Sequence, residues 1–184
     1  MAATESAMLA LGTSAPQFSL KDVRDGKVHT VESLTGPKGL LVMFICTHCP
    51  FVKHVEQELA RIGRDYQESG IGIAAISSND ADKYPDDAPD GLAEQAKRVG
   101  FVFPYLYDET QEAARAYDAT CTPDFFLFDA QRKLVYRGQL DGSRPGNSVP
   151  VTGKDLRAAM DAVVAGKPVP KEQKPSIGCN IKWA

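Results

Sequence analysis

The sequence predicts an α/β fold in which helices flank a central mixed sheet, with an N-terminal β-hairpin before it and a C-terminal extension after it. Two unbroken apolar runs, Leu40 to Ile45 and Ile71 to Ile76, have the length of strands that are covered on both faces. Between them, apolar residues recur every three or four positions from Phe51 onward, which is the spacing of one helix face. This order predicts two parallel strands joined by a right-handed crossover.

Residues 1–10 are predicted to be a flexible N-terminal arm, and residues 11–166 a single domain. Asp25-Gly26 is a strong turn signal, so the flanking segments 18–23 and 28–31 are expected to pair as a hairpin. Residues 33–38 are interpreted as a loop that leads into the central strand.

The central helix is expected over residues 51–67, followed by the strand at 71–76. Residues 80–90 form a long loop rich in Pro and Asp, which we interpret as acidic and exposed. Its acidic residues do not follow the spacing of a twelve-residue calcium loop, so a calcium site is not expected.

The second half of the chain alternates short elements. Helices are expected at 92–99, 110–117 and 155–165, and strands at 103–107, 125–128 and 134–140, the last two as a hairpin. Residues 141–153 are rich in Gly, Pro, Ser and Asn and are expected to form a loop. Residues 167–184 show no periodic pattern and are interpreted as a C-terminal tail.

Composition excludes several classes of function. The formal net charge of −3 gives no support to binding of nucleic acid or anionic membranes. No apolar run approaches the roughly 20 residues that span a bilayer. The first ten residues lack a basic residue ahead of their short apolar patch, so we expect no signal peptide and a cytoplasmic protein.

The strongest chemical signal is Cys49, which follows the predicted central strand and precedes Pro50. Proline suits the first turn of a helix, where its missing N–H costs nothing. Cys49 should therefore lie at a helix N-terminus, where free N–H groups and the positive end of the helix dipole favour a thiolate. Such surroundings lower a cysteine pKa to roughly 3.5–7.5, so Cys49 is the predicted nucleophile.

Three other cysteines are candidates for partnership with Cys49. Four cysteines are too few for a disulfide scaffold, and in a reducing compartment they indicate redox chemistry, metal binding or core packing. Cys46 either resolves a mixed disulfide or sulfenate at Cys49 or fills the core. Cys121 is a second candidate resolving residue or a buried small residue. We expect Cys179, in the tail, to be idle or structural.

His48 either stabilises the Cys49 thiolate and passes a proton, or is a solvated loop residue. His54 is expected on the surface of the helix. No metal or cofactor is predicted, because the sequence lacks a second Cys/His pair at the spacing of a zinc site.

Several segments together resemble the thioredoxin-like superfamily, specifically its peroxiredoxin-like branch of the alkyl hydroperoxide reductase and thiol-specific antioxidant type. The matching segments are 11–18, 42–50, Thr122-Pro123 and 125–138, while 120–126 and 175–183 are similar to one subgroup of that branch. The resemblance implies a thioredoxin fold and an attacking cysteine at Cys49. It also implies a cis-proline at Pro123 and a substrate groove shaped by His48, Pro50, Thr122 and Pro123.

The chain departs from the family patterns at four positions, one of which is Pro123, in the place of an arginine that typical peroxiredoxins carry near the site. Thioredoxins carry a second cysteine three residues after the first, where this chain has Val52. In typical peroxiredoxins a threonine precedes the attacking cysteine by three residues and a proline by seven; these positions hold Cys46 and Val42. The peroxide-polarising groups are thus missing.

The leading hypothesis is a cytoplasmic thiol–disulfide oxidoreductase that is reduced by a thioredoxin- or glutathione-like partner. The alternatives are an antioxidant thiol peroxidase that reduces hydroperoxides through Cys49, and a non-catalytic binding module of thioredoxin fold. The expected substrate is a protein disulfide or a hydroperoxide, and the sequence leaves a homodimer open.

Overall fold

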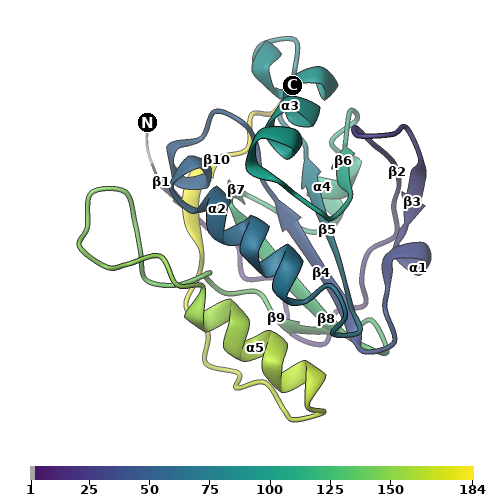
Figure 1. Cartoon of the computed structure of the whole chain (residues 1–184), viewed down its shortest axis with the longest axis vertical. Coiled ribbons are helices and arrows are strands. Elements are labelled where there is room, and N and C mark those ends of the chain that lie inside the picture. The colour runs from purple at the N-terminus through teal and green to yellow at the C-terminus, as the bar shows by residue number, and fades with distance from the viewer. Residues whose placement is uncertain (1–2) are drawn as a thin grey trace.

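A computed structural model describes residues 3–184 and confirms the predicted α/β class (Figure 1). The strands are β1 (Ala3–Glu5), β2 (Ser19–Asp22), β3 (Val28–Thr30), β4 (Gly39–Phe44), β5 (Ile71–Ser77), β6 (Tyr105–Tyr107), β7 (Cys121–Thr122), β8 (Asp124–Asp129), β9 (Leu134–Tyr136) and β10 (Ile177–Asn180). The helices are α1 (Val31–Leu34), α2 (Pro50–Asp65), α3 (Pro89–Val99), α4 (Glu112–Ala116) and α5 (Lys154–Val164), with a 3-10 turn at Pro85–Asp87.

The main sheet is mixed and has the strand order β3-β2-β6-β5-β4-β8-β9. Strand β4 is central: it runs parallel to β5 on one side and antiparallel to β8 on the other. The hairpin predicted around Asp25-Gly26 is confirmed as β2 and β3, and β2 joins the sheet through β6. This arrangement brings the carboxyl end of β4, and with it Cys49, to the edge of the sheet where α2 begins (Figure 1).

Helices cover both faces of the sheet. Successive side chains of β4 point to opposite sides, and all of its residues are therefore buried. Leu41 and Met43 pack into the core that α2, α3 and α5 cover. Leu40, Val42 and Phe44 pack on the other face, against α1, α4 and their neighbours. Among the helices of residues 3–184, none combines the length and apolar character that crossing a membrane requires.

Helix α1 occupies part of a segment that the sequence analysis interpreted as a loop. Its first turn is closed by a capping box: the Thr30 side chain accepts a hydrogen bond from the Ser33 N–H, and the Ser33 side chain accepts one from the Thr30 N–H. This reciprocal arrangement satisfies two backbone donors that a helix leaves open, and it stabilises a single turn that has no apolar period of its own.

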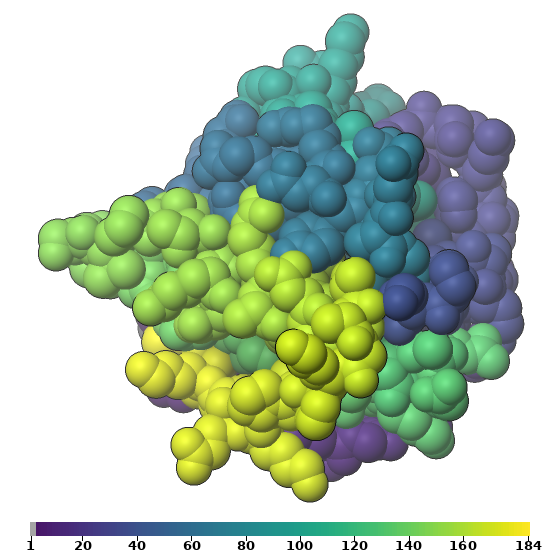
Figure 2. Space-filling view, turned by 60° about the horizontal axis from the view of Figure 1, so that its bottom comes forward, coloured from purple at the N-terminus to yellow at the C-terminus, as the bar shows by residue number. Residues whose placement is uncertain are grey.

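The N-terminal arm and the C-terminal tail form a second sheet, which the sequence analysis did not predict. Strand β10 lies between β1 and β7 and is antiparallel to both. Residues 167–176 run beside α5 before β10 begins, as the space-filling view shows (Figure 2). Pairing between the two ends of a chain leaves no local pattern, because backbone N–H and C=O groups make it.

The tail is also tied to a buried carboxyl group at the start of β8. The Ser176 hydroxyl donates to Asp124 Oδ1 at 2.8 Å, while Oδ2 has no hydrogen-bond partner within residues 3–184. Burial raises the pKa of Asp124 to about 7, and hydrogen bonds including that from Ser176 oppose the rise. The folded protein therefore favours the neutral acid at Asp124.

We expect Asp124→Asn to change how stability depends on pH. Between about pH 4 and pH 7 the unfolded chain loses the proton that folded Asp124 retains, so the wild-type free energy of unfolding falls as pH rises through this window. The variant stays neutral, so its stability relative to wild type should rise by up to about 4 kcal/mol above pH 7. Urea unfolding at pH 5 and pH 8 measures this difference, and parallel pH profiles would contradict it.

Leu59 tests the packing of α2 on the sheet. Its side chain is fully buried in the core that α2, α3 and α5 cover. We expect Leu59→Ala to lower the free energy of unfolding by roughly 2–5 kcal/mol, because it removes buried methyl groups and leaves a cavity. Gln57→Ala, at an exposed position of the same helix, should change it by no more than about 0.5 kcal/mol. Equal losses in chemical denaturation would show that Leu59 is not a core residue.

Candidate active site

Cys49 is the N-cap residue of α2, as the sequence predicted, and Pro50 occupies the first helical position. Its backbone is extended, and its carbonyl oxygen accepts the first helical hydrogen bonds, from the N–H groups of Val52 and Lys53 at 3.0 and 2.9 Å. The positive end of the helix dipole is thus directed at this residue. The local geometry is the one that favours a thiolate at Cys49 when it is reduced.

The cis-proline is the second feature of the site. The Thr122-Pro123 peptide bond is cis, as the resemblance implied. Strand β7 ends at Thr122, and the Thr122 carbonyl oxygen lies 3.4 Å from Cys49 Sγ. Thr122 and Pro123 therefore border the reactive sulfur, although they are 73 and 74 residues away in sequence.

Cys49 forms a disulfide with Cys179 of β10. The two Cα atoms are 6.1 Å apart, within the usual range for a disulfide, and 130 residues separate them in sequence. The sulfur-bearing residues are 0% and 1% exposed, respectively. Cys179 is therefore not idle, one of the two states expected for it: it is bonded to the predicted nucleophile.

The register of the second sheet explains this pairing. Cys179 lies opposite Thr122 where β10 pairs with β7, and Thr122 is the residue whose carbonyl contacts Cys49. The sequence analysis had no position for the tail, so it had no means of placing Cys179 here. The only signal it offered was the even number of cysteines.

Cys46 and Cys121 form no disulfide in the part of the chain that the structure describes, so the resolving role predicted for either is not what this structure displays. Burial, with a further contribution from the charge of Asp87, raises the pKa of Cys46 to about 11. Burial, reinforced by Asp124, raises the pKa of Cys121 well above its usual range. Both residues are thus protonated thiols at neutral pH and poor nucleophiles.

His48 lies between two partners from the loop that follows β5. Its ring stacks on Tyr84 at 5.3 Å between centroids, and its Nδ1 is 2.7 Å from Asp87 Oδ2. This is an ion-pair distance without hydrogen-bond alignment, and neither ring nitrogen has a hydrogen-bond partner within residues 3–184. His48 is therefore held beside Cys49, rather than free in a solvated loop.

Asp87 is the site residue that sequence reasoning missed. It is fully buried, contrary to the expectation of an exposed acidic loop, and it accepts hydrogen bonds from the Thr47 N–H at 2.8 Å and the Thr47 hydroxyl at 2.6 Å. Asn79 Nδ2 donates to its other oxygen at 2.9 Å. These bonds fix the loop that precedes Cys49. Nothing in the sequence distinguishes Asp87 from the other acidic residues of 80–90.

Cys46, His48 and Asp87 bring one potential metal-ligating atom each within 4.8 Å of one another. The carboxylate already accepts three hydrogen bonds, and its 2.7 Å approach to His48 is shorter than two ligands of one ion allow. A zinc ligand at Cys46 would also have to be a thiolate. We interpret this cluster as a polar network that supports the active-site loop.

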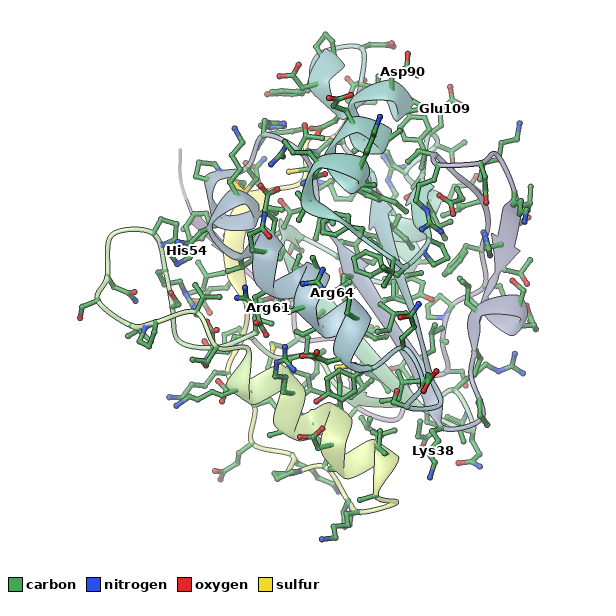
Figure 3. The ribbon with its side chains drawn as sticks, in the orientation of Figure 1. Lys38, His54, Arg61, Arg64, Asp90 and Glu109 are labelled. Atoms are coloured by element: carbon green, nitrogen blue, oxygen red, sulfur yellow. A yellow bond between two sulfur atoms is a disulfide. The ribbon has the colours of Figure 1, made fainter. Side chains whose placement is uncertain are left out.

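A shallow hollow beside Pro123 lies between the start of α2 and the loop 141–153, and Phe51 and Ile177 are among its lining residues. His54, on α2, points toward that loop and places its Nε2 2.7 Å from Ser143 Oγ (Figure 3). A wider hollow between α5 and residues 169–174 contains none of the predicted site residues. Of these two hollows, only the one at Pro123 is lined by a predicted site residue.

Known proteins resemble the chain in structure and in sequence. A solved structure of an uncharacterized conserved protein from Geobacillus kaustophilus is 56% identical, with a TM-score of 0.98 over 100% of this chain and 97% of that chain. A thiol:disulfide interchange protein from Chlorobium tepidum TLS, 22% identical, has a TM-score of 0.65 over 84% of this chain and 98% of that one, and so shares the fold. That protein is of the thioredoxin family, which confirms the predicted thioredoxin fold.

Among proteins of assigned activity, thiol-disulfide oxidoreductase ResA of Geobacillus thermodenitrificans (strain NG80-2) is 28% identical over 134 residues, covering 71% of this chain and 70% of that protein. The AhpC/TSA family matches residues 11–137, a segment that includes β4, Cys49 and Pro123. Over these residues the chain belongs to the AhpC/TSA family.

Proposed function

We propose that the protein is a thiol–disulfide oxidoreductase in which Cys49 is the attacking cysteine and Cys179 the resolving one. The observation that carries the proposal is the Cys49–Cys179 disulfide at the N-terminus of α2, beside the cis-proline. A bond at this position is the oxidised product that such an enzyme forms after one turnover. The similarity to thiol-disulfide oxidoreductase ResA supports the same reaction class.

The reaction is a pair of thiol–disulfide exchanges. The Cys49 thiolate attacks a substrate disulfide, forms a mixed disulfide and releases the first substrate thiolate. The Cys179 thiolate then attacks Cys49 Sγ, forms the internal disulfide and releases the second substrate thiolate. Two electrons pass from the two cysteines to the substrate, and an external thiol of the thioredoxin or glutathione class returns them.

His48 supplies the proton chemistry in this scheme. It precedes Cys49 directly, and Asp87 and Tyr84 hold its ring. Its ring nitrogens can donate or accept a proton, so we assign His48 the transfer of a proton to a departing thiolate or from a resolving thiol. Thr122 and Pro123 then border the groove in which the substrate disulfide would lie.

Substrate and compartment follow from the same chemistry. The substrate class is a protein disulfide, as the name of the ResA relative implies for that protein. We place the protein in the cytoplasm, because two of its cysteines are buried thiols and its turnover needs a reducing partner. The oligomeric state plays no part in the proposed mechanism.

We expect Cys49→Ser to lose insulin disulfide reduction by on the order of 10³-fold or more, because it removes the nucleophile. Cys179→Ser should lose turnover but still trap one equivalent of mixed disulfide at Cys49. Cys121→Ser is the matched control and should retain activity, since its thiol is protonated and unbonded. Mapping of the oxidised wild-type protein by mass spectrometry without reduction should yield the peptide pair 49–179, and any other pair would refute the assignment.

A second candidate function is a thiol peroxidase, which the match to the AhpC/TSA family favours. In that reaction the Cys49 thiolate takes one oxygen from a hydroperoxide and becomes a sulfenate, which Cys179 converts to the same disulfide with release of water. Both reactions thus end in the bond seen here, and only the oxidant separates them. The absence of the family's threonine and proline, replaced by Cys46 and Val42, favours disulfide exchange.

Dimedone distinguishes the two oxidants. In Cys179→Ser treated with stoichiometric hydrogen peroxide, we expect little dimedone adduct at Cys49, and rapid formation of mixed disulfide when a disulfide is added instead. Competition between hydrogen peroxide and the disulfide, followed by intact-mass analysis, measures the ratio of the two rates at which they react with Cys49. Faster labelling with peroxide would make the peroxidase the primary function, and a Cys49 that reacts with neither faster than a free thiol would indicate a binding module.

A further inference from the structure

Strand β10, which carries Cys179, pairs with the very short strand β7. Strand β7 consists of Cys121 and Thr122, and both of its residues pair with β10: Thr122 opposite Cys179, and Cys121 opposite Asn180. Because the Thr122 carbonyl also contacts Cys49 Sγ, the position of β10 along β7 decides whether Cys179 reaches Cys49. A two-residue pairing is weak alone. Strand β1 pairs with the outer edge of β10, and two further features hold β10 in register on β7.

Gly178 is the first of these features. A Cβ atom at this position would lie 1.8 Å from the Thr122 carbonyl oxygen and 2.5 Å from its carbon. These are backbone atoms next to Pro123, so no flexible side chain can move aside. Gly178 is not in a left-handed conformation, so its role is the close approach of two backbones rather than an unusual turn.

The residues after Cys179 form the second feature, an anchor at the end of the tail. The Ile181 N–H donates to the Thr120 carbonyl at 3.1 Å, and the Lys182 N–H donates to Asn79 Oδ1 at 2.9 Å. The Lys182 carbonyl accepts a bond from Gln111 Nε2 at 2.9 Å, and Gln111 Oε1 accepts one from the Ala184 N–H at 3.0 Å. Asn79 and Gln111 are buried, so the anchor is shielded from water.

The anchor and the active-site loop share one carboxylate. Asn79 accepts the tail through Oδ1 and donates to Asp87 through Nδ2, and Asp87 accepts from the Thr47 N–H. The segment that carries Cys179 and the loop that leads to Cys49 are therefore positioned by the same buried group. This connection fixes the two sulfur atoms relative to each other from both sides.

We propose that Gly178, Asn79 and Gln111 are positioning residues that seat β10 on β7 and thereby determine how readily Cys179 captures Cys49. The proposal rests on the proposed disulfide exchange and adds that β10 controls access to Cys49. While β10 is seated, both sulfur-bearing residues are buried, so an external disulfide or thiol reaches Cys49 only when β10 leaves β7. When β10 pairs with β7, the internal disulfide can form and external partners are excluded. When β10 leaves β7, the site is open to those partners.

The test equilibrates the full chain with mixtures of reduced and oxidised glutathione. The reaction is reduced protein plus oxidised glutathione giving the Cys49–Cys179 disulfide plus two reduced glutathione molecules. Alkylation of free thiols and peptide mapping measure the fraction of the internal disulfide and of the Cys49–glutathione intermediate. The ratio of the internal disulfide to the Cys49–glutathione intermediate, multiplied by the concentration of reduced glutathione, gives the effective concentration of Cys179 at Cys49.

In Gly178→Ala we expect the effective concentration to fall by roughly 10-fold or more, with the Cys49–glutathione species accumulating. Asn79→Ala and Gln111→Ala should lower it in the same direction, because each removes an anchor that preorganises the tail. Glu172→Ala is the matched control: its side chain is exposed in the same C-terminal segment, outside β10 and its anchor, so the ratio should stay near wild type. In the reduced state, Gly178→Ala should also speed alkylation of Cys49.

Circular dichroism and urea unfolding separate folding from function, because they report the state of the whole fold. Alkylation of Cys121 does not separate the two, since Cys121 pairs with β10 and becomes exposed when β10 leaves β7. If Gly178→Ala is unfolded by these two measurements, the Asn79→Ala and Gln111→Ala variants decide the question by the same ratio. A folded Gly178→Ala or anchor variant with the wild-type ratio would overturn this inference while leaving the oxidoreductase intact. A wild-type protein that forms no 49–179 disulfide would instead refute the proposed function.

Discussion

The contact on which the site depends is the pairing of β10 with β7. Without it, Cys49 would be one cysteine at the start of α2, with two protonated thiols, Cys46 and Cys121, for neighbours. With it, a fourth cysteine from the end of the chain lies opposite Thr122 and bonds to Cys49. In the proposed reaction, this non-local strand pairing supplies the resolving cysteine that thioredoxins carry on the same helix, where this chain has Val52.

The segments that hold Cys49 and Cys179 differ in how they respond to reduction of the disulfide. Cys49 is fixed by the end of β4, the first turn of α2 and the hydrogen bonds of Asp87 to Thr47. Cys179 is fixed by the pairing of β10 with β7 and β1, by one close backbone approach at Gly178 and by a terminal anchor. Breaking the disulfide removes a covalent restraint from the second set and leaves the first intact. The tail is therefore the part of the site that can move on reduction.

Sequence patterns predicted the elements that depend on local apolar periods. The buried run of β4, the helix face of α2 and the turn at Asp25-Gly26 each leave a signal within a few residues, and each was confirmed. The position of Cys49 followed from them. The pairing of β1 with β10, the partnership of Cys179 and the burial of Asp87 depend on contacts between distant segments. Their residues look like those of any polar loop or tail, so no window of sequence indicated them.

The complete burial of Cys49 is compatible with a catalytic role because of what covers the residue. A nucleophile sealed from solvent by unrelated core residues would be inert, but here its neighbour is the strand that carries its own disulfide partner. The oxidised state hides both sulfurs, because the bond and the strand pairing are made together. Because Gly178 has no side chain, its backbone can lie close to the Thr122 carbonyl group when β10 pairs with β7. A Cβ atom at this position would clash with that carbonyl. In the proposed exchange, this close approach of β10 to Thr122 is what brings the tail to Cys49.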